Sequence, residues 1–108
     1  MTTPAVLYLW APNDAVRLLQ RAHEDQCRRY AKRQGWEVVD IIHETGPDPH
    51  SAHRDGLQQV YHVLRSGRAE IVLTTSRRML GDEETYSDIA QIIESKECAG
   101  TIRLATPG

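Results

Sequence analysis

An unbroken apolar run over residues 5–10 (AVLYLW) constrains the fold of this chain more than any other feature. The segment lacks the alternation of apolar and polar residues that marks a strand with one face in water. Such a run is typical of a parallel sheet whose two faces are both covered. Pro12 cannot donate a backbone hydrogen bond and restricts Ala11, so the strand is expected to end there.

A helical pattern follows this strand. Asn13 and Asp14 are suited to begin a helix, and small or apolar side chains then recur near one face as far as Gln34. Gly35 is expected to end the helix in a left-handed conformation, which glycine adopts at no steric cost. The residues predicted near the inward face are Val16, Leu19, His23, Cys27, Tyr30 and Ala31.

Three more strands and two more helices complete the pattern. The compact β-branched segment 36–42 predicts a second strand, and segments 69–75 and 101–105 predict a third and a fourth. Apolar residues at helical spacing predict one helix near residues 57–64 and another over residues 82–98.

This alternation of strands and helices predicts a single α/β domain over residues 1–108. We expect a three-layer sandwich with a mostly parallel sheet of four or five strands. Binding sites in such folds gather outside the carboxyl ends of the strands. The segments that follow the strands are therefore the places to look for function, above all the long loop 43–53 and residues 74–78.

Charge and composition exclude several classes of function. A net charge of −2 provides no overall positive field for nucleic acid. The apolar run is too short for a signal peptide or a membrane span, so we expect a cytoplasmic protein without membrane contact. Cys27 and Cys98 lack the paired spacing of zinc ligands and are predicted to be buried thiols. No glycine-rich phosphate loop follows the first strand, which counts against a flavodoxin-type nucleotide site, and no cofactor is expected.

Several short motifs occur in an order that is known from one protein family. They are Tyr8; residues 27–39; Glu44-Thr45-Gly46 with Arg54-Asp55-Gly56-Leu57; and residues 71–73 with Leu80-Gly81. In this order and spacing they resemble the N-terminal catalytic domain of serine recombinases, the family of resolvases, invertases and serine integrases. The resemblance implies a resolvase-like version of the α/β sandwich.

The resemblance also implies a chemistry whose main groups are missing here. In the family a serine hydroxyl attacks a DNA phosphate, and arginines stabilise the charge that develops on the phosphate oxygens. Pro12 stands at the serine position and Trp10 at the first arginine of the family's Tyr-x-Arg-x-Ser motif. The family's Asp-Arg-Leu-x-Arg motif reads Arg78-Met79-Leu80-Gly81-Asp82, which lacks both arginines; a shift by one residue places Arg78 on the first. Arg54 remains at the arginine before Gly-Leu.

These departures predict a degenerate serine-recombinase domain, related to DNA recombination and mobile elements by resemblance but not itself an enzyme. We expect an accessory or regulatory module that acts through a protein partner or self-association. Contact with DNA is expected to be weak, because no C-terminal DNA-binding extension follows residue 108.

Two alternatives remain open at the predicted rim of the sheet. Arg54, Arg77 and Arg78 could form a phosphate-binding patch, or they could be solvated loop residues, one of which pairs with Asp55 or Asp82. Ser76 could replace the missing nucleophile in a residual or repurposed phosphoryl-transfer or hydrolytic enzyme that uses the loop arginines. No histidine–aspartate pair is evident in the sequence to activate this serine.

Histidines in and near the long loop are the remaining candidates for a site. They are His43, His50, His53 and His62. His50-x-x-His53 has a conceivable metal-ligand spacing, but it lies in a loop interrupted by proline and without a rigid frame. We interpret these residues as ordinary histidines and predict no metal site.

Overall fold

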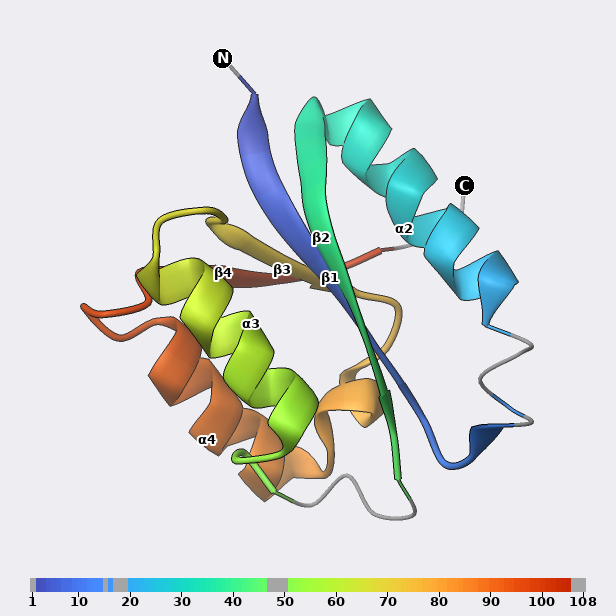
Figure 1. The fold of residues 1–108 in the computed structure, drawn as a ribbon, viewed down its shortest axis with the longest axis vertical. Helices are drawn as coiled ribbons and strands as arrows, with labels where there is room; N and C mark the ends of the chain where they lie inside the picture. Colours follow the sequence, from blue (N-terminus) through green and yellow to red (C-terminus); the bar gives the residue numbers. More distant parts are fainter. Residues whose placement is uncertain (1, 15, 17–19, 47–50, 106–108) are drawn as a thin grey trace.

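The computed structural model describes residues 2–14, 16, 20–46 and 51–105. Strands and helices alternate through these residues, as predicted (Figure 1). In chain order the elements are β1 (Thr3–Ala11), α2 (Arg21–Gln34), β2 (Trp36–Thr45), α3 (Asp55–Arg65), β3 (Ile71–Thr74), the short 3₁₀ helix η1 (Arg77–Leu80), α4 (Glu83–Ile93) and β4 (Thr101–Leu104).

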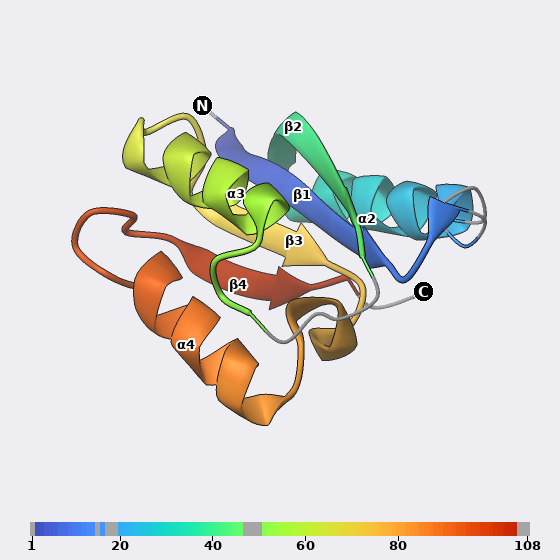
Figure 2. The same cartoon turned by 60° about the horizontal axis from the view of Figure 1, so that its bottom comes forward.

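The described strands form one sheet in the order β2-β1-β3-β4, and all of its neighbouring strands are parallel. Helix α2 covers one face of the sheet, and α3 and α4 lie side by side over the other (Figures 1 and 2). The predicted α/β sandwich with a mostly parallel sheet is therefore confirmed, and the sheet has the smaller of the two expected strand numbers.

Strand β1 is buried on both faces, which explains its unbroken apolar sequence. Residues 5–9 are all completely inaccessible to solvent. Val6 and Tyr8 belong to the core under α3 and α4, whereas Leu7 and Leu9 belong to the core under α2. This division follows from the alternation of side chains along a strand.

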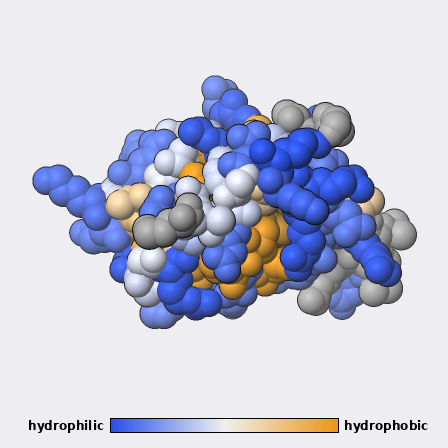
Figure 3. All heavy atoms as spheres, turned by 90° about the horizontal axis from the view of Figure 1, so that it is seen from above, coloured by the Kyte–Doolittle hydropathy of each residue, from blue (hydrophilic) through white to orange (hydrophobic). Residues whose placement is uncertain are grey.

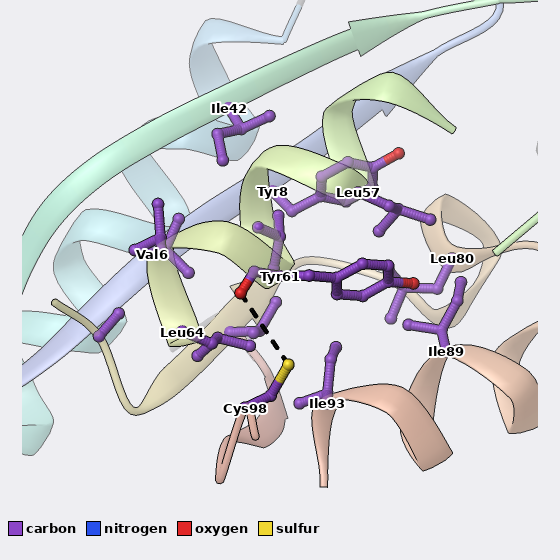
Figure 4. Packing of buried hydrophobic residues seen from close by; sticks show 14 of the residues in the cluster. Val6, Tyr8, Ile42, Leu57, Tyr61, Leu64, Leu80, Ile89, Ile93 and Cys98 are labelled. Atoms are coloured by element: carbon purple, nitrogen blue, oxygen red, sulfur yellow. Dashed lines mark hydrogen bonds between the residues drawn. The ribbon is translucent and has the colours of Figure 1, made fainter. Parts of the chain in front are cut away.

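The larger of the two cores lies between the sheet and the pair α3 and α4 (Figure 4). Its completely buried side chains include Leu57, Leu80 and Ile89. Tyr61 lies at its centre, and its hydroxyl donates a 2.7 Å hydrogen bond to the Ala52 carbonyl oxygen. This bond fixes the segment that leads from the long loop into α3.

Several element boundaries differ from those that the sequence predicted. Strand β2 continues beyond residue 42 to Thr45, so the first part of the predicted loop pairs with β1 instead. Helix α4 ends at Ile93, five residues before Cys98, which lies in the turns that follow. The predicted third strand is longer than the observed β3. Glu70, just before β3, still donates to the Pro4 carbonyl oxygen at 2.9 Å and accepts from the Thr101 N–H at 3.0 Å.

The inward-facing residues predicted for the helix after β1 are also partly wrong. Cys27 and Ala31 are buried as expected, but Val16 and His23 are exposed, and Leu19 lies outside the described residues. Gly35 ends α2 with a φ of 76°, which confirms the predicted left-handed conformation. Both cysteines are free and buried, as predicted.

Candidate functional site

The strand order places a crevice at the carboxyl ends of β1 and β3. The chain leaves β1 toward β2 on one side and later returns to β3 on the other, and ligands of open α/β sheets bind where the order reverses. Trp10 lies near this end of β1, and Ser76 follows β3. The face from which β1 begins is a different region, largely hydrophilic around one apolar area (Figure 3).

Glu44 organises the end of β2 through both of its carboxylate oxygens. Oε1 accepts a 2.5 Å hydrogen bond from the Tyr8 hydroxyl, and Oε2 accepts a 2.6 Å bond from the Gly56 backbone N–H. Oε1 also lies 3.6 Å from Nε of Arg54. One carboxylate therefore joins β1, β2 and the start of α3.

Arg54 is held in this network rather than presented to solvent. Its side chain is 9 % exposed, and that of Glu44 is 12 % exposed. The guanidinium lies 5.8 Å from the centre of the Tyr8 ring, and Nη2 donates to the Met79 carbonyl oxygen at 3.3 Å. Among the described residues, the buried Nε and Nη1 of Arg54 have no hydrogen-bond partner. Arg54 therefore pairs with Glu44, a partner that the sequence did not suggest.

Burial controls the protonation of the tyrosine in this network. Desolvation, followed by the hydrogen bond to Glu44, raises the pKa of Tyr8 far above its usual range, although the Arg54 charge acts in the opposite direction. Tyr8 therefore remains a neutral donor to the carboxylate throughout the physiological range.

Gly56 permits the close approach of Glu44 to α3. A Cβ at this position would lie 2.8 Å from both Cδ and Oε1 of Glu44, closer than real carbon atoms approach. At the other end of this region, the Gly46 N–H donates to the Ala11 carbonyl oxygen at 3.0 Å. Two hydrogen bonds therefore connect the ends of β1 and β2: one from Tyr8 to Glu44 and one from Gly46 to Ala11.

Trp10 and Pro12 occupy the positions that the resemblance assigns to catalysis. Trp10 packs against both cores, and its backbone carbonyl oxygen accepts a 2.6 Å hydrogen bond from Nε2 of Gln20. Pro12 is exposed just after β1. Neither side chain can attack a phosphate or donate a charged hydrogen bond to it.

The other candidate arginines lie on η1, close to where Arg54 reaches Met79. Arg77 stacks on the ring of Tyr86, with Cζ 4.2 Å from the ring centre. Arg78 is exposed, and its backbone N–H donates to Ser76 Oγ at 3.1 Å, which makes Ser76 the N-cap of η1. The structure brings the three arginines to the same end of the sheet, but each has a different environment: Arg54 pairs with Glu44, Arg77 stacks on Tyr86, and Arg78 is exposed. Phosphate binding by these residues stays a prediction.

The histidines are dispersed in the described part of the chain. Nε2 of His43 lies 3.4 Å from Oε1 of Glu24, whereas His53 contacts Gln58 and His62 is exposed on α3. His50 lies outside the described residues. Among residues 2–14, 16, 20–46 and 51–105, no three metal-ligating side chains are arranged to hold an ion.

Sequence reasoning missed the part that Glu44 plays. The sequence pointed to Glu44 only as part of a loop motif, yet it is a strand residue and the centre of the network. The available signal was an acidic residue at the end of a β-branched strand, ten positions before an Arg-x-Gly sequence.

None of the described helices is long and apolar enough to cross a membrane.

The parallel sheet, with helices on both faces and a candidate site at its carboxyl rim, defines an open α/β domain. The family model "Resolvase, N terminal domain" matches residues 17–101, and the chain belongs to this family of serine recombinases, whose members act in DNA recombination. None of the curated proteins matches the chain.

Two solved structures support the assignment of the fold. The C-terminal catalytic domain of ISC1926 TnpA, an IS607-like serine recombinase, matches with a TM-score of 0.80 and 16% identity, over 97% of this chain and 71% of that chain. The N-terminal catalytic domain of TP901-1 integrase matches with a TM-score of 0.75 and 16% identity, over 94% of this chain and 77% of that chain. At these identities the likeness establishes a shared fold.

Proposed function

We propose that this chain is a serine-recombinase domain that no longer cleaves DNA and instead works as an accessory or regulatory module through protein contacts. Phosphoryl transfer by the family mechanism needs an attacking hydroxyl and a cluster of cations around the phosphate oxygens. Pro12 has no hydroxyl, and the neutral indole of Trp10 stands where the family has an arginine.

The observation that carries this proposal is the state of Arg54. It is the one arginine that matches its family motif in either alignment, and its side chain is buried against Glu44 and the Tyr8 ring. The negative charge of Glu44 compensates the positive charge of Arg54, so the attraction of this guanidinium for a phosphate is weaker. Within the described residues, no hydroxyl or thiol side chain is hydrogen-bonded to Arg54.

Ser76 is a weak replacement for the missing nucleophile. Its hydroxyl oxygen accepts the backbone N–H of Arg78 as a helix cap, and no histidine or carboxylate hydrogen bond to it is seen among the described residues. A serine hydroxyl without a base to remove its proton is a poor nucleophile at neutral pH. Arg77 and Arg78 remain candidates for binding an anion without cleaving it.

Incubation with supercoiled plasmid tests the proposal, with an active serine recombinase as the positive control. We expect no nicked or linear product from this chain above a blank without protein. Nicking that disappears in Ser76→Ala but persists in Ser51→Ala would overturn the non-catalytic assignment and support the enzymatic alternative. A pull-down that recovers a binding partner would support the module directly.

A further inference from the structure

Strand β2 forms one border of the sheet, and its outer side pairs with no other strand of the described structure (Figure 2). The strand is ten residues long, and its middle carries the largely β-branched sequence VVDII over residues 38–42. The unpaired backbone groups of such an edge can pair with a strand of another molecule. A long apolar edge therefore favours self-association unless a feature of the strand prevents it.

A β-bulge interrupts the pairing of β2 with β1 in this apolar stretch. Ala5 lies opposite Val38, whereas the next residue of β1, Val6, lies opposite Asp40. Val39 is therefore the extra residue of the bulge. The apolar side chains before and after Asp40 pack against the two cores, whereas the Asp40 side chain is 40 % exposed. The bulge thus leaves a carboxylate at the border of the sheet.

The direction of the backbone shows which amides of β2 face outward. The Gly46 N–H donates to the Ala11 carbonyl oxygen, so it points toward β1. Backbone groups alternate in direction along a strand, and the pairing of residues 40–45 with β1 has no shift in register. The N–H groups of Ile41 and His43 therefore point away from β1, toward the free edge.

The carboxylate of Asp40 occupies one of these outward-facing amides. Its Oδ1 accepts a 2.9 Å hydrogen bond from the Ile41 N–H. Its other oxygen, Oδ2, lies 3.8 Å from Nη2 of Arg68, so the carboxylate has a cation on one side and the amide on the other. A carbonyl oxygen of an added strand would have to displace Asp40 Oδ1 before it could reach this N–H.

We propose that Asp40 keeps the edge of β2 from pairing with the β2 strand of a second copy of this chain. Its side-chain oxygen takes the place that a carbonyl oxygen of the second copy would occupy, and the bulge holds the carboxylate at the border. Without this cap, two antiparallel copies of β2 would offer each other apolar side chains and outward-facing backbone groups. The inference goes beyond the proposed function and does not depend on it.

Sedimentation velocity of Asp40→Ala and Asp40→Asn at about 0.1–1 mM protein tests the proposal, with the wild-type chain expected to be monomeric. Alanine removes the acceptor oxygen, so this variant should associate as its concentration rises. Asparagine keeps an oxygen for the Ile41 N–H and should associate at least about tenfold more weakly than alanine. An Asp40→Ala chain that is folded by circular dichroism yet monomeric, equal association of the two variants, or a wild type that pairs through β2 would overturn the proposal.

Amide hydrogen exchange identifies the surface through which Asp40→Ala associates. On association, the outward N–H groups of Ile41 and His43 should exchange at least about tenfold more slowly than in the dilute monomer. The N–H groups of Ile42 and Glu44 point toward β1 by the same alternation and should change little. Association that leaves the outward amides unprotected would contradict pairing through this edge.

Glu37→Ala is the control variant for the loss of charge. Glu37 is an exposed acidic residue of the same strand, and its carboxylate accepts a hydrogen bond from the Thr2 hydroxyl. This variant should stay monomeric, and association equal to that of Asp40→Ala would refute the role of the cap. In the wild-type chain the Ile41 amide should exchange about fivefold more slowly than in dilute Asp40→Ala, and equal rates would refute it as well.

Discussion

Replacement of Glu44 by glutamine tests whether the buried network holds the ends of the strands together. Glutamine keeps the shape of the side chain but removes the charge that faces Arg54. It also sets an NH₂ group against one of two donors, the Tyr8 hydroxyl at 2.5 Å or the Gly56 N–H at 2.6 Å. The variant therefore leaves a buried cation without its partner and weakens at least one charged hydrogen bond.

The structure sets the size of this effect. Breaking a buried ion pair by removal of one partner costs about 3–5 kcal/mol. The lower end applies here, because both side chains keep about a tenth of their surface exposed and the closest atoms, Arg54 Nε and Glu44 Oε1, are 3.6 Å apart. We expect Glu44→Gln to lower the free energy of unfolding by about 3 kcal/mol, which moves the urea midpoint by roughly 1.5–2 M for a domain of this size.

Urea unfolding followed by circular dichroism measures this change, together with a double-mutant cycle. Arg54→Met combined with Glu44→Gln should cost at least about 1 kcal/mol less than the sum of the single variants, because the two side chains interact directly. Glu37→Gln is the control: the exposed Glu37 carboxylate accepts a hydrogen bond from the exposed Thr2 hydroxyl, and the change should shift stability by less than about 0.5 kcal/mol. A loss below 1 kcal/mol for Glu44→Gln, or additive single effects, would refute the reasoning.

Gly56, Cys27 and the pair Trp10 and Pro12 each allow a further prediction. Gly56→Ala should destabilise the chain by about 2 kcal/mol because its Cβ collides with the Glu44 side chain, and in a Glu44→Ala background the same change should cost less, because only the 3.0 Å approach to the Cβ of residue 44 remains; unfolding curves in both backgrounds check this difference. Burial raises the pKa of Cys27 from 9.0 to about 12, so stability should fall as pH rises from about 9, where the unfolded chain loses the proton first; Cys27→Ala should lessen that fall. Trp10→Arg combined with Pro12→Ser should not restore plasmid cleavage, because at least one arginine of the later motif is absent in either alignment; efficient cleavage by the double variant would contradict this.

The sequence allowed prediction of the fold where local pattern and tertiary environment agree. The run at residues 5–9 is apolar because both faces of β1 are covered, and Gly35 ends α2 with a φ of 76°, a conformation that favours glycine. Prediction was less accurate where packing decides the outcome. Val16 and His23 match the helical period but are exposed, because the period alone does not say how far a neighbouring layer extends.

The candidate site was less predictable because its contacts join residues that are far apart in sequence. Tyr8 and Glu44 are 36 positions apart, and nothing in either local segment indicates that they share a hydrogen bond. The proline and glycine after Glu44 suggested an irregular loop, whereas pairing with β1 keeps the segment in the sheet as far as Thr45. Long-range pairing of this kind depends on the assembled sheet and cannot be derived from turn-forming composition.

The persistence of Arg54 has a structural explanation that does not require catalysis. If Arg54 were lost on its own, Glu44 would remain buried with its charge uncompensated, and breaking such a pair is strongly destabilising. Under the proposed function, stability alone would be a reason to keep Arg54. The presence of Arg54 is therefore not by itself a sign of cleavage activity, and the cost of Arg54→Met in urea unfolding measures its structural role.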